Sequence, residues 1–222
     1  MIYITGDTHG SIERFKPFKK LFPKYRDFLL VCGDFGFIWN GTESERKELL
    51  KLEKFACNIL FVEGTHDNLD ALSEFPMEHF RGGMVRRLAK NVFWLQRGNI
   101  YDIDGVKIFA FGGGESYDAD EREEGVNWWR NELATVEEID AAKAALQKAG
   151  NCVDIVLTHQ DPRLELGLVD HRSERINAPT AFLGELSRNL QYKHWYFGMH
   201  HLDRTISPKM TAVFEKTVQY KL

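Results

Sequence analysis

The sequence has few cysteines. Only three occur among the 222 residues, and they lie far apart in apolar surroundings, at Cys32, Cys57 and Cys152. An odd number at this spacing is typical neither of a disulfide framework nor of a zinc site built from paired cysteines. We therefore expect three reduced thiols that are buried in the core.

Long apolar runs and an excess of positive charge are also missing. No run approaches the roughly 18 apolar residues of a membrane span, and the chain opens on a strand-like segment instead of a basic and apolar leader. The formal net charge is -4, whereas nucleic-acid binding usually requires a basic face. We expect a cytoplasmic protein that binds neither membranes nor nucleic acids, and the sequence leaves its oligomeric state open.

The remaining composition is that of an ordinary globular domain. Hydrophobic residues make up 43% of the chain and charged residues 28%, which is typical of soluble folds. A length of 222 residues suits one domain with a sizeable core. Because no internal repeat, low-complexity tract or linker interrupts the sequence, we predict a single domain over residues 1-222.

Five predicted strands end in polar side chains that are suited to metal binding. The strands are Ile2–Thr5, Phe28–Gly33, Asn58–Gly64, Val153–Thr158 and His194–Gly198, and they are followed in turn by Asp7 and His9, by Asp34, by Thr65 and His66, by His159, and by His200 and His201. Sites in open α/β sheets form at the carboxyl ends of strands, so we expect these side chains to converge. Carboxylate and imidazole ligands without cysteine suit Mn, Fe or Zn ions that activate water. Taken singly, any of them could instead be a core histidine or a turn carboxylate.

The other elements are predicted from periodicity and capping signals. Helices are expected over 11–22, 42–55, 135–150 and 179–190, the second and third of them opened by capping boxes. Short strands, mostly antiparallel, are expected over 84–88, 92–96, 100–103 and 106–111, with a last strand over 213–220. The acidic segment Glu115 to Trp129 is expected to form a long loop, which in a compact domain is more often functional than idle.

The order of these motifs resembles that of the calcineurin-like metallophosphoesterases. Their pattern is D-x-H, then G-D, then G-N-H-[D/E], then a histidine after a strand, then G-H-x-H, and this chain offers Asp7-Thr-His, Gly33-Asp, Gly64-Thr-His-Asp, His159 and Gly198-Met-His-His in the same order. The resemblance implies an α+β fold, a four-layer αββα sandwich of mixed β-sheets, with a two-metal site at the strand ends. It also implies that Asp7, His9 and His201 hold the first metal, that Asp34 bridges both metals, and that His159 holds the second. His66 would protonate the leaving alkoxide or steady the phosphoryl oxygens.

Two positions depart from the family pattern. Thr65 stands where the family has asparagine, and Met199 stands where the last motif has its first histidine. In the family both side chains serve the second metal, and a thioether or a hydroxyl is a poor ligand for Mn or Fe(III). We therefore expect one tightly bound ion and a second that is weak or absent. The alternative is that both changes are harmless and that His200 or a loop residue replaces the lost ligand.

The resemblance implies two competing functions. The first is a metal-dependent phosphoric-ester hydrolase, either a phosphodiesterase or a phosphomonoesterase, acting on a small-molecule phosphate ester. The second is a catalytically weak or inactive protein that senses a phosphate ligand or binds a partner. Retention of His66, which is useful mainly for chemistry, favours the enzyme. Arg204, Trp39 and Asn40 follow the motifs and could contact substrate, although each could equally be a surface or packing residue.

Overall fold

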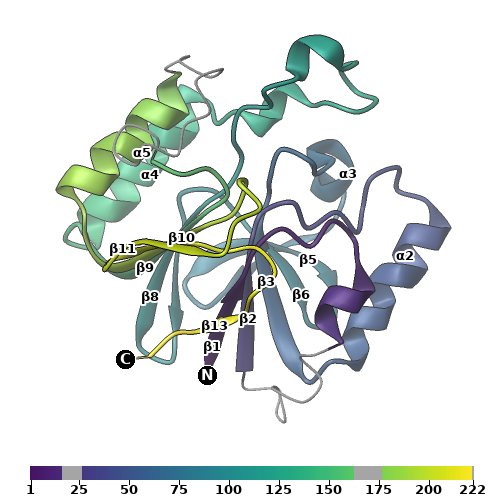
Figure 1. The fold of residues 1–222 in the computed structure, drawn as a ribbon, viewed down its shortest axis with the longest axis horizontal. Helices are drawn as coiled ribbons and strands as arrows, with labels where there is room; N and C mark the ends of the chain where they lie inside the picture. The colour runs from purple at the N-terminus through teal and green to yellow at the C-terminus, as the bar shows by residue number, and fades with distance from the viewer. Residues whose placement is uncertain (17–26, 163–176, 222) are drawn as a thin grey trace.

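The computed structural model describes residues 1–16, 27–162 and 177–221. In these residues two mixed β-sheets pack face to face, and helices cover their outer faces (Figure 1). This arrangement is the four-layer αββα sandwich that the family resemblance implies, and that expectation is confirmed.

The first sheet holds the first three strands of the chain side by side. Its strand order is β13-β1-β2-β3-β6-β5-β4. β1, β2, β3 and β6 run parallel, and β13, β5 and β4 pair antiparallel with their neighbours. The bounds are Ile2–Thr5 for β1, Asp27–Cys32 for β2, Cys57–Val62 for β3, Met77–Phe80 for β4, Gly83–Ala89 for β5, Val92–Leu95 for β6 and Val218–Gln219 for β13.

The second sheet holds the remaining strands in the order β11-β12-β10-β9-β8-β7. Its four inner strands run parallel, and its two edge strands are antiparallel. The bounds are Ile100–Ile103 for β7, Val106–Phe111 for β8, Cys152–Thr158 for β9, Gln191–Phe197 for β10, Arg204–Ser207 for β11 and Met210–Ala212 for β12.

Strong start signals place the longer helices. The capping boxes Thr42/Glu45 and Thr135/Glu138 both form, with the hydroxyl and the carboxylate each accepting a backbone N–H. The α-helices are α2 (Glu43–Leu50), α3 (Leu69–Ser73), α4 (Val136–Lys148) and α5 (Ala178–Asn189), and the 3-10 helices are η1 (Ile12–Phe15), η2 (Lys51–Lys54), η3 (Ala119–Glu121) and η4 (Arg130–Glu132).

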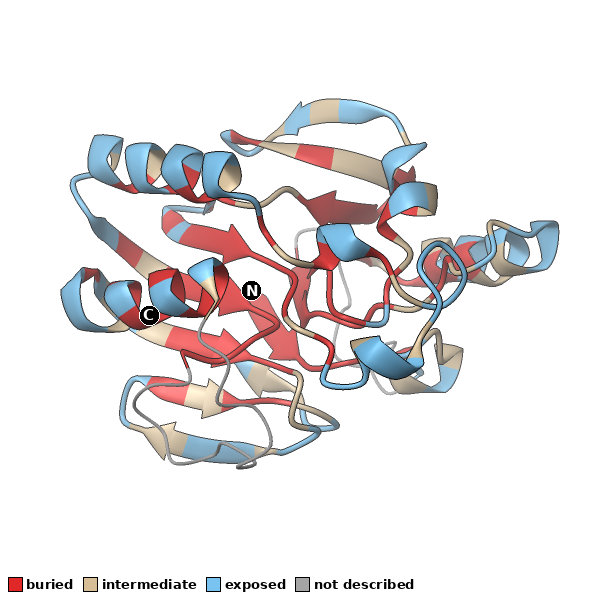
Figure 2. Cartoon of the chain, turned by 90° about the horizontal axis from the view of Figure 1, so that it is seen from above, coloured by how far each residue is buried: buried red, intermediate tan, exposed pale blue. Residues whose placement is uncertain are grey.

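Strand alternation explains how each sheet serves two cores. Leu29 and Val31 of β2 pack outward against α2, η2 and α3, whereas Phe28 and Leu30 of the same strand face the second sheet. A third core lies between the second sheet and the helices α4 and α5. Figure 2 shows the result, with buried strands in the middle and helices that are buried only on their inward faces. The three cores hold the strand ends in fixed positions.

The predicted strands are confirmed within a few residues, with one exception at the C-terminus. The strand expected over 213–220 is wrong, because only Val218–Gln219 is a strand. Asp203 causes the difference, since its carboxylate accepts backbone N–H groups from Phe214, Glu215 and Lys216 at 2.9–3.1 Å. These donors are thereby folded around a side chain and are unavailable to a ladder.

Other details depart from the sequence expectations. Strands β4, β11 and β12 and helix α3 were not predicted, and they are short elements of three to five residues. The helix expected over 11–22 appears as η1, and residues 17–22 lie outside the described residues. Cys32 and Cys57 are buried as expected, but Cys152 is exposed because it opens β9 at the surface. None of the described helices is both long and apolar enough to cross a membrane.

Candidate metal centre

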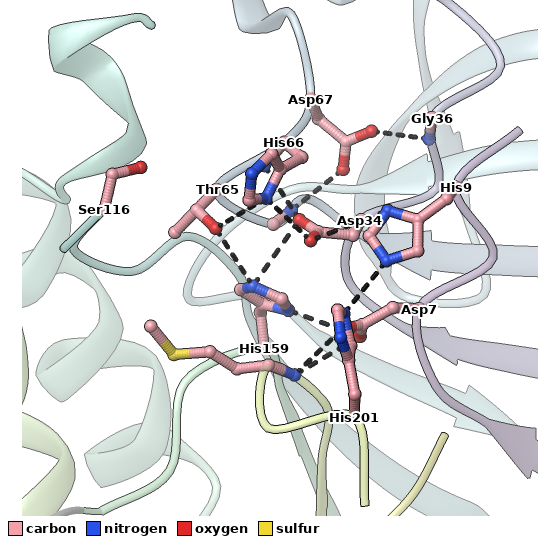
Figure 3. Close-up of polar contacts among 12 residues, drawn as sticks. Asp7, His9, Asp34, Gly36, Thr65, His66, Asp67, Ser116, His159 and His201 are labelled. Atoms are coloured by element: carbon pink, nitrogen blue, oxygen red, sulfur yellow. Dashed lines mark hydrogen bonds and ion pairs between the residues drawn. The ribbon is translucent and has the colours of Figure 1, made fainter. Parts of the chain in front are cut away.

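The loops after β1, β2, β3, β9 and β10 come together at one edge of the two sheets (Figure 3). They bring together the motif residues that follow each of these strands in the sequence. These are Asp7, His9, Asp34, Thr65, His66, His159, Met199 and His201. Parallel pairing within each sheet is the reason, because it directs the carboxyl ends of neighbouring strands to the same side.

Four of these side chains form a cluster that could hold a metal ion. One ligand atom from each of Asp7, His9, Asp34 and His201 lies within 4.8 Å of the other three. Nε2 of His201 is 3.0 Å from Nε2 of His9 and 3.2 Å from Oδ2 of Asp7. Both carboxylates are buried, and a buried anion needs a compensating cation. This mixed oxygen and nitrogen donor set fits a transition metal ion such as Mn, Fe or Zn.

The electrostatic environment of the cluster favours protonation states in which its side chains can bind a metal ion. Burial alone would raise the pKa of Asp34, but the His159 and His66 imidazoles hold the pKa well below its usual range, so Asp34 is ionised. Burial lowers the pKa of His9, which leaves a neutral imidazole with a lone pair to donate. The hydrogen-bonded Asp7 carboxylate raises the pKa of His201, so protons and a metal ion compete for that ring.

Left-handed backbone conformations concentrate at this centre. Seven non-glycine residues of the described chain have positive φ, and four of them belong to the site: His9 (47°), Asp34 (44°), Met199 (66°) and His201 (50°). Such conformations are costly for residues with a Cβ and persist where the surroundings enforce them. Here the N–H of His9 donates to the Asp34 carbonyl at 2.8 Å, and the N–H of Met199 donates to Oδ2 of Asp7 at 3.2 Å. These tight turns direct the side chains of the strand-end loops toward the same cluster.

Glycines at the strand ends leave room for the ligands. A Cβ on Gly64 would lie 2.0 Å from Oδ1 of Asp34, and a Cβ on Gly198 would lie 2.2 Å from Oδ1 of Asp7. Neither glycine has positive φ, so here the requirement is for space and not for an unusual backbone conformation. The glycines that the sequence shows beside the motifs therefore leave the space that the ligand carboxylates occupy.

Asp67 is a positioning residue whose role the sequence did not reveal. Its buried carboxylate accepts the N–H groups of Gly36 at 2.8 Å, Gly64 at 2.9 Å and Phe35 at 3.1 Å. Burial and the nearby Asp34 carboxylate raise its pKa to about 6, against the opposing effect of the three donors. Asp67 thereby ties the loop after β2 to the loop after β3. The acidic last position of Gly64-Thr-His-Asp was the only signal of it.

Fewer donor groups surround the position where the family resemblance implies a second metal. His159 is fully buried, with Nδ1 3.0 Å from the Cys32 carbonyl and Nε2 3.5 Å from Oδ1 of Asp34. Burial alone would lower the pKa of His159, but Asp34 and Asp7 raise it. Oγ1 of Thr65 lies 3.5 Å from Nε2 of His159. Nδ1 of His159 also lies 3.7 Å from Oδ1 of Asp7. Among the described residues, however, His159 belongs to no group of three or more metal-binding side chains whose ligand atoms all lie within 4.8 Å of one another.

His200 does not lie in the metal cluster. Its Nε2 is 3.2 Å from Oδ1 of the buried Asp161, which is consistent with the opposite side-chain direction expected one residue away from His201. The structure therefore lends no support to the alternative in which His200 replaces a lost ligand.

His66 connects the cluster to a pocket. Its Nδ1 lies 3.1 Å from Oδ2 of Asp34, and its Nε2 lies 2.6 Å from Nη2 of Arg122. Arg122 comes from the acidic loop and was missed in the sequence, where only the unusual length of the loop marked it. The pocket has a volume of about 300 Å³, and its lining includes Thr65, Met199 and His201.

Two of the three suggested substrate contacts, Arg204 and Asn40, are exposed on other parts of the chain. Arg204 is exposed on β11, and Asn40 is exposed in the loop before α2, where its N–H donates to Glu45. Neither lines the pocket beside the metal cluster. Their contact with substrate stays a prediction.

Comparison with known proteins identifies a family. The family model for calcineurin-like phosphoesterases matches residues 1–205, whereas no curated protein sequence matches the chain. Among solved structures, the chain is similar to a Staphylococcus aureus protein described as a candidate 5'-nucleotidase, with a TM-score of 0.49 and 12% identity over 96% of this chain and 48% of the other. It is also similar to an Aquifex aeolicus protein of unknown function, with a TM-score of 0.34 and 17% identity over 80% and 89% of the two chains. This chain spans about half the length of the Staphylococcus aureus protein, and both likenesses are too low for a function to be transferred.

The space requirement at Gly198 can be tested by Gly198→Ala. The added methyl would meet both Oδ1 of Asp7 and the Cys32 carbonyl, at 2.2 and 2.3 Å. We expect Asp7 to shift, manganese affinity to fall about tenfold or more, and the free energy of unfolding to fall by about 1–3 kcal/mol. Manganese affinity is measured by competition with a chelating dye, and stability by thermal unfolding.

Gly105→Ala is the matched control for this substitution. Gly105 has a φ of +86°, and an added Cβ would meet nothing within 4 Å. It should cost about 1–2 kcal/mol of stability through backbone strain alone and leave manganese affinity unchanged. Wild-type manganese affinity in the Gly198→Ala protein would show that the space beside Asp7 does not matter.

Proposed function

The chain belongs to the calcineurin-like phosphoesterase family, and we propose that it hydrolyses phosphoric esters with one tightly held metal ion. The observation that carries the proposal is the cluster of Asp7, His9, Asp34 and His201, in which two buried carboxylates and two imidazoles face one another. When bound there, a transition metal ion would polarise phosphate oxygens and lower the pKa of water. The native ester and the identity of the metal, whether Mn, Fe or Zn, stay open.

The side chains of this centre have three proposed roles: binding the ion, positioning a loop and transferring a proton. Asp7, His9, Asp34 and His201 would hold the ion, and Asp34 also accepts the His66 N–H at 2.8 Å, which fixes the loop after β3. Because Nδ1 of His66 faces the ionised Asp34, its Nε2 is the atom that faces the pocket. In our proposal Nε2 passes a proton to the leaving oxygen of the ester or donates to a phosphoryl oxygen.

We also propose that a second ion binds weakly or not at all. Of the residues that would hold it, Asp34 and His159 lie 3.5 Å apart, from Oδ1 to Nε2, whereas Thr65 and Met199 offer a hydroxyl and a thioether. Neither group is a strong ligand for Mn or Fe(III). Nucleophile activation and charge stabilisation would then fall mainly to the first ion and to nearby protein groups.

The same loss of ligands favours a second candidate function. A chain with one damaged metal site could bind a phosphate ester without hydrolysing it and act as a sensor or a partner-binding protein. A metal-supplemented assay on an aryl phosphodiester and an aryl phosphomonoester separates the two. Turnover that rises with added manganese supports the hydrolase, and binding of orthophosphate without any turnover supports the sensor. A cytoplasmic location and a single-domain organisation stay predictions from the sequence.

The first prediction of this proposal concerns metal stoichiometry. One manganese ion per chain should remain after dialysis, and Asp34→Asn should weaken its binding more than His159→Ala does, because Asp34 is a charged ligand of the four-residue cluster and His159 lies outside it. Metal content is measured on protein purified without chelators. Asp27→Asn is the control, because this buried carboxylate lies at the other end of β2, 2.8 Å from the N-terminal amine. Two tightly held ions, or a larger loss for His159→Ala, would contradict the ligand assignment.

The second prediction is a restoration of the other metal position. Thr65→Asn with Met199→His should raise second-ion affinity and phosphodiester hydrolysis together. Asparagine supplies a carbonyl oxygen and histidine an imidazole, and histidine tolerates the positive φ of position 199 better than most residues. Because about 1.4 kcal/mol corresponds to a tenfold change in affinity, two recovered ligands could strengthen binding by several orders of magnitude.

The single variants complete this experiment. Since both residues act on one ion, the double variant should exceed the sum of the singles. Metal stoichiometry and turnover are compared at a fixed manganese concentration. A double variant that binds a second ion and stays inactive would favour the sensor, and a wild type that already matches it would show that Thr65 and Met199 are not the defect.

A further inference from the structure

The pocket beside the metal cluster carries one cationic side chain that the proposed mechanism does not use. Of the described residues that line it, Arg122 is the only lysine or arginine, and the same lining includes Asp34, Thr65 and Met199. Thr65 and Met199 are the positions where ligands of a second ion are missing. The Arg122 guanidinium therefore lines the same pocket as the two positions where ligands of a second ion are missing.

The loop that carries Arg122 is firmly anchored. Both N–H and Oγ of Ser116 donate to the buried Glu132 carboxylate, at 2.8 and 2.7 Å, and Trp129 packs edge-on against Trp39 with ring centroids 4.9 Å apart. Figure 3 shows Ser116 of this loop across from Thr65 and His66. The guanidinium is further tethered by Asp118, whose Oδ2 lies 2.8 Å from Nη2. Arg122 is thus held at the pocket and is only 12% exposed.

The contact between Arg122 and His66 fixes the hydrogen positions. A guanidinium can only donate, so Nε2 of His66 must accept the hydrogen bond at 2.6 Å. The hydrogen of the ring then lies on Nδ1 and points to Asp34, 3.1 Å away. While this contact lasts, Nε2 is engaged and cannot serve a leaving oxygen.

We propose that Arg122 is a phosphate-binding residue that leaves His66 when an ester enters the pocket. A phosphoryl group offers the guanidinium two charged acceptors in a geometry that matches its fork, which is stronger than a single neutral imidazole nitrogen. The exchange has two effects: Arg122 supplies positive charge on the side where the second ion is weak, and the lone pair on Nε2 of His66 is released, so that Nε2 can take up the proton that it would pass to the leaving oxygen. The inference rests on the proposed function for its substrate, a small phosphate ester.

The experiment measures binding of inorganic orthophosphate to the manganese-loaded protein by calorimetry. Arg122→Met removes the charge and keeps the apolar stem, and it should weaken orthophosphate binding about tenfold to a hundredfold. Arg122→Lys keeps a point charge but loses the two parallel donors of the guanidinium. Its orthophosphate affinity should lie between those of Arg122→Met and the wild type. Manganese affinity should stay within about twofold of wild type in both, because the polar contacts of Arg122 are with His66, Asp118 and Asn127 and none is with the four-residue cluster.

Arg130→Met is the matched control. Arg130 directly follows the same loop, is 76% exposed and pairs with Glu124, so its loss should leave orthophosphate affinity unchanged. Wild-type orthophosphate affinity in Arg122→Met, an equal loss in Arg130→Met, or no orthophosphate binding by the wild type would overturn the inference. If Arg122→Met does not fold, Arg122→Lys decides: reduced phosphate affinity with intact manganese affinity supports the inference, and wild-type phosphate affinity overturns it.

The assay also separates this inference from the proposed function. Orthophosphate binding that depends on Arg122, in a protein that hydrolyses no ester, would refute the hydrolase and leave the phosphate-binding residue in place. Ester hydrolysis with an unchanged KM in Arg122→Met would do the opposite. With both correct, KM for an aryl phosphomonoester should rise about tenfold or more in Arg122→Met and not in Arg130→Met.

Discussion

Two buried carboxylates in one cluster, Asp7 and Asp34, are the constraint on which the site depends. Anions removed from water are costly unless they are paired with a cation, and around these two lie imidazoles from three other loops. The cluster of Asp7, His9, Asp34 and His201 resolves the problem if it holds a metal ion. The two neighbouring negative charges repel each other, and the same charges give the cluster its affinity for a cation. The ion that would balance the charge of the site is therefore also the ion that its proposed chemistry requires.

The fold supplies the rigidity that such a cluster requires. Three cores lock the strands of both sheets, so that their carboxyl ends can be crowded without displacing one another. Within that frame Gly64 and Gly198 remove the side-chain bulk that would collide with Asp34 and Asp7. Left-handed backbone at His9, Asp34 and His201 adds local strain, which the hydrogen bonds between the loops offset. Asp67 contributes three of those bonds from a single carboxylate.

The sequence predicted those parts of the molecule that depend on local signals. Apolar runs ending in glycine and aspartate marked the strands, and Thr42/Glu45 and Thr135/Glu138 marked the starts of α2 and α4. It could not predict features that depend on contacts between distant residues. The contact of Arg122 with His66 spans 56 positions. The Asp203 carboxylate abolishes the start of an expected strand by accepting backbone N–H groups from residues 11 to 13 positions away. Neither contact leaves a periodic trace in the sequence, because each depends on where the fold places the loops.

The most direct test of the central claim is the anomalous diffraction of crystals grown with manganese, recorded at a wavelength where manganese scatters anomalously. The account predicts one strong peak bounded by Asp7, His9, Asp34 and His201, and a far weaker peak or none beside His159 and Thr65. Two peaks of equal height would contradict the damaged second position, and a main peak outside the four ligands would contradict the site itself.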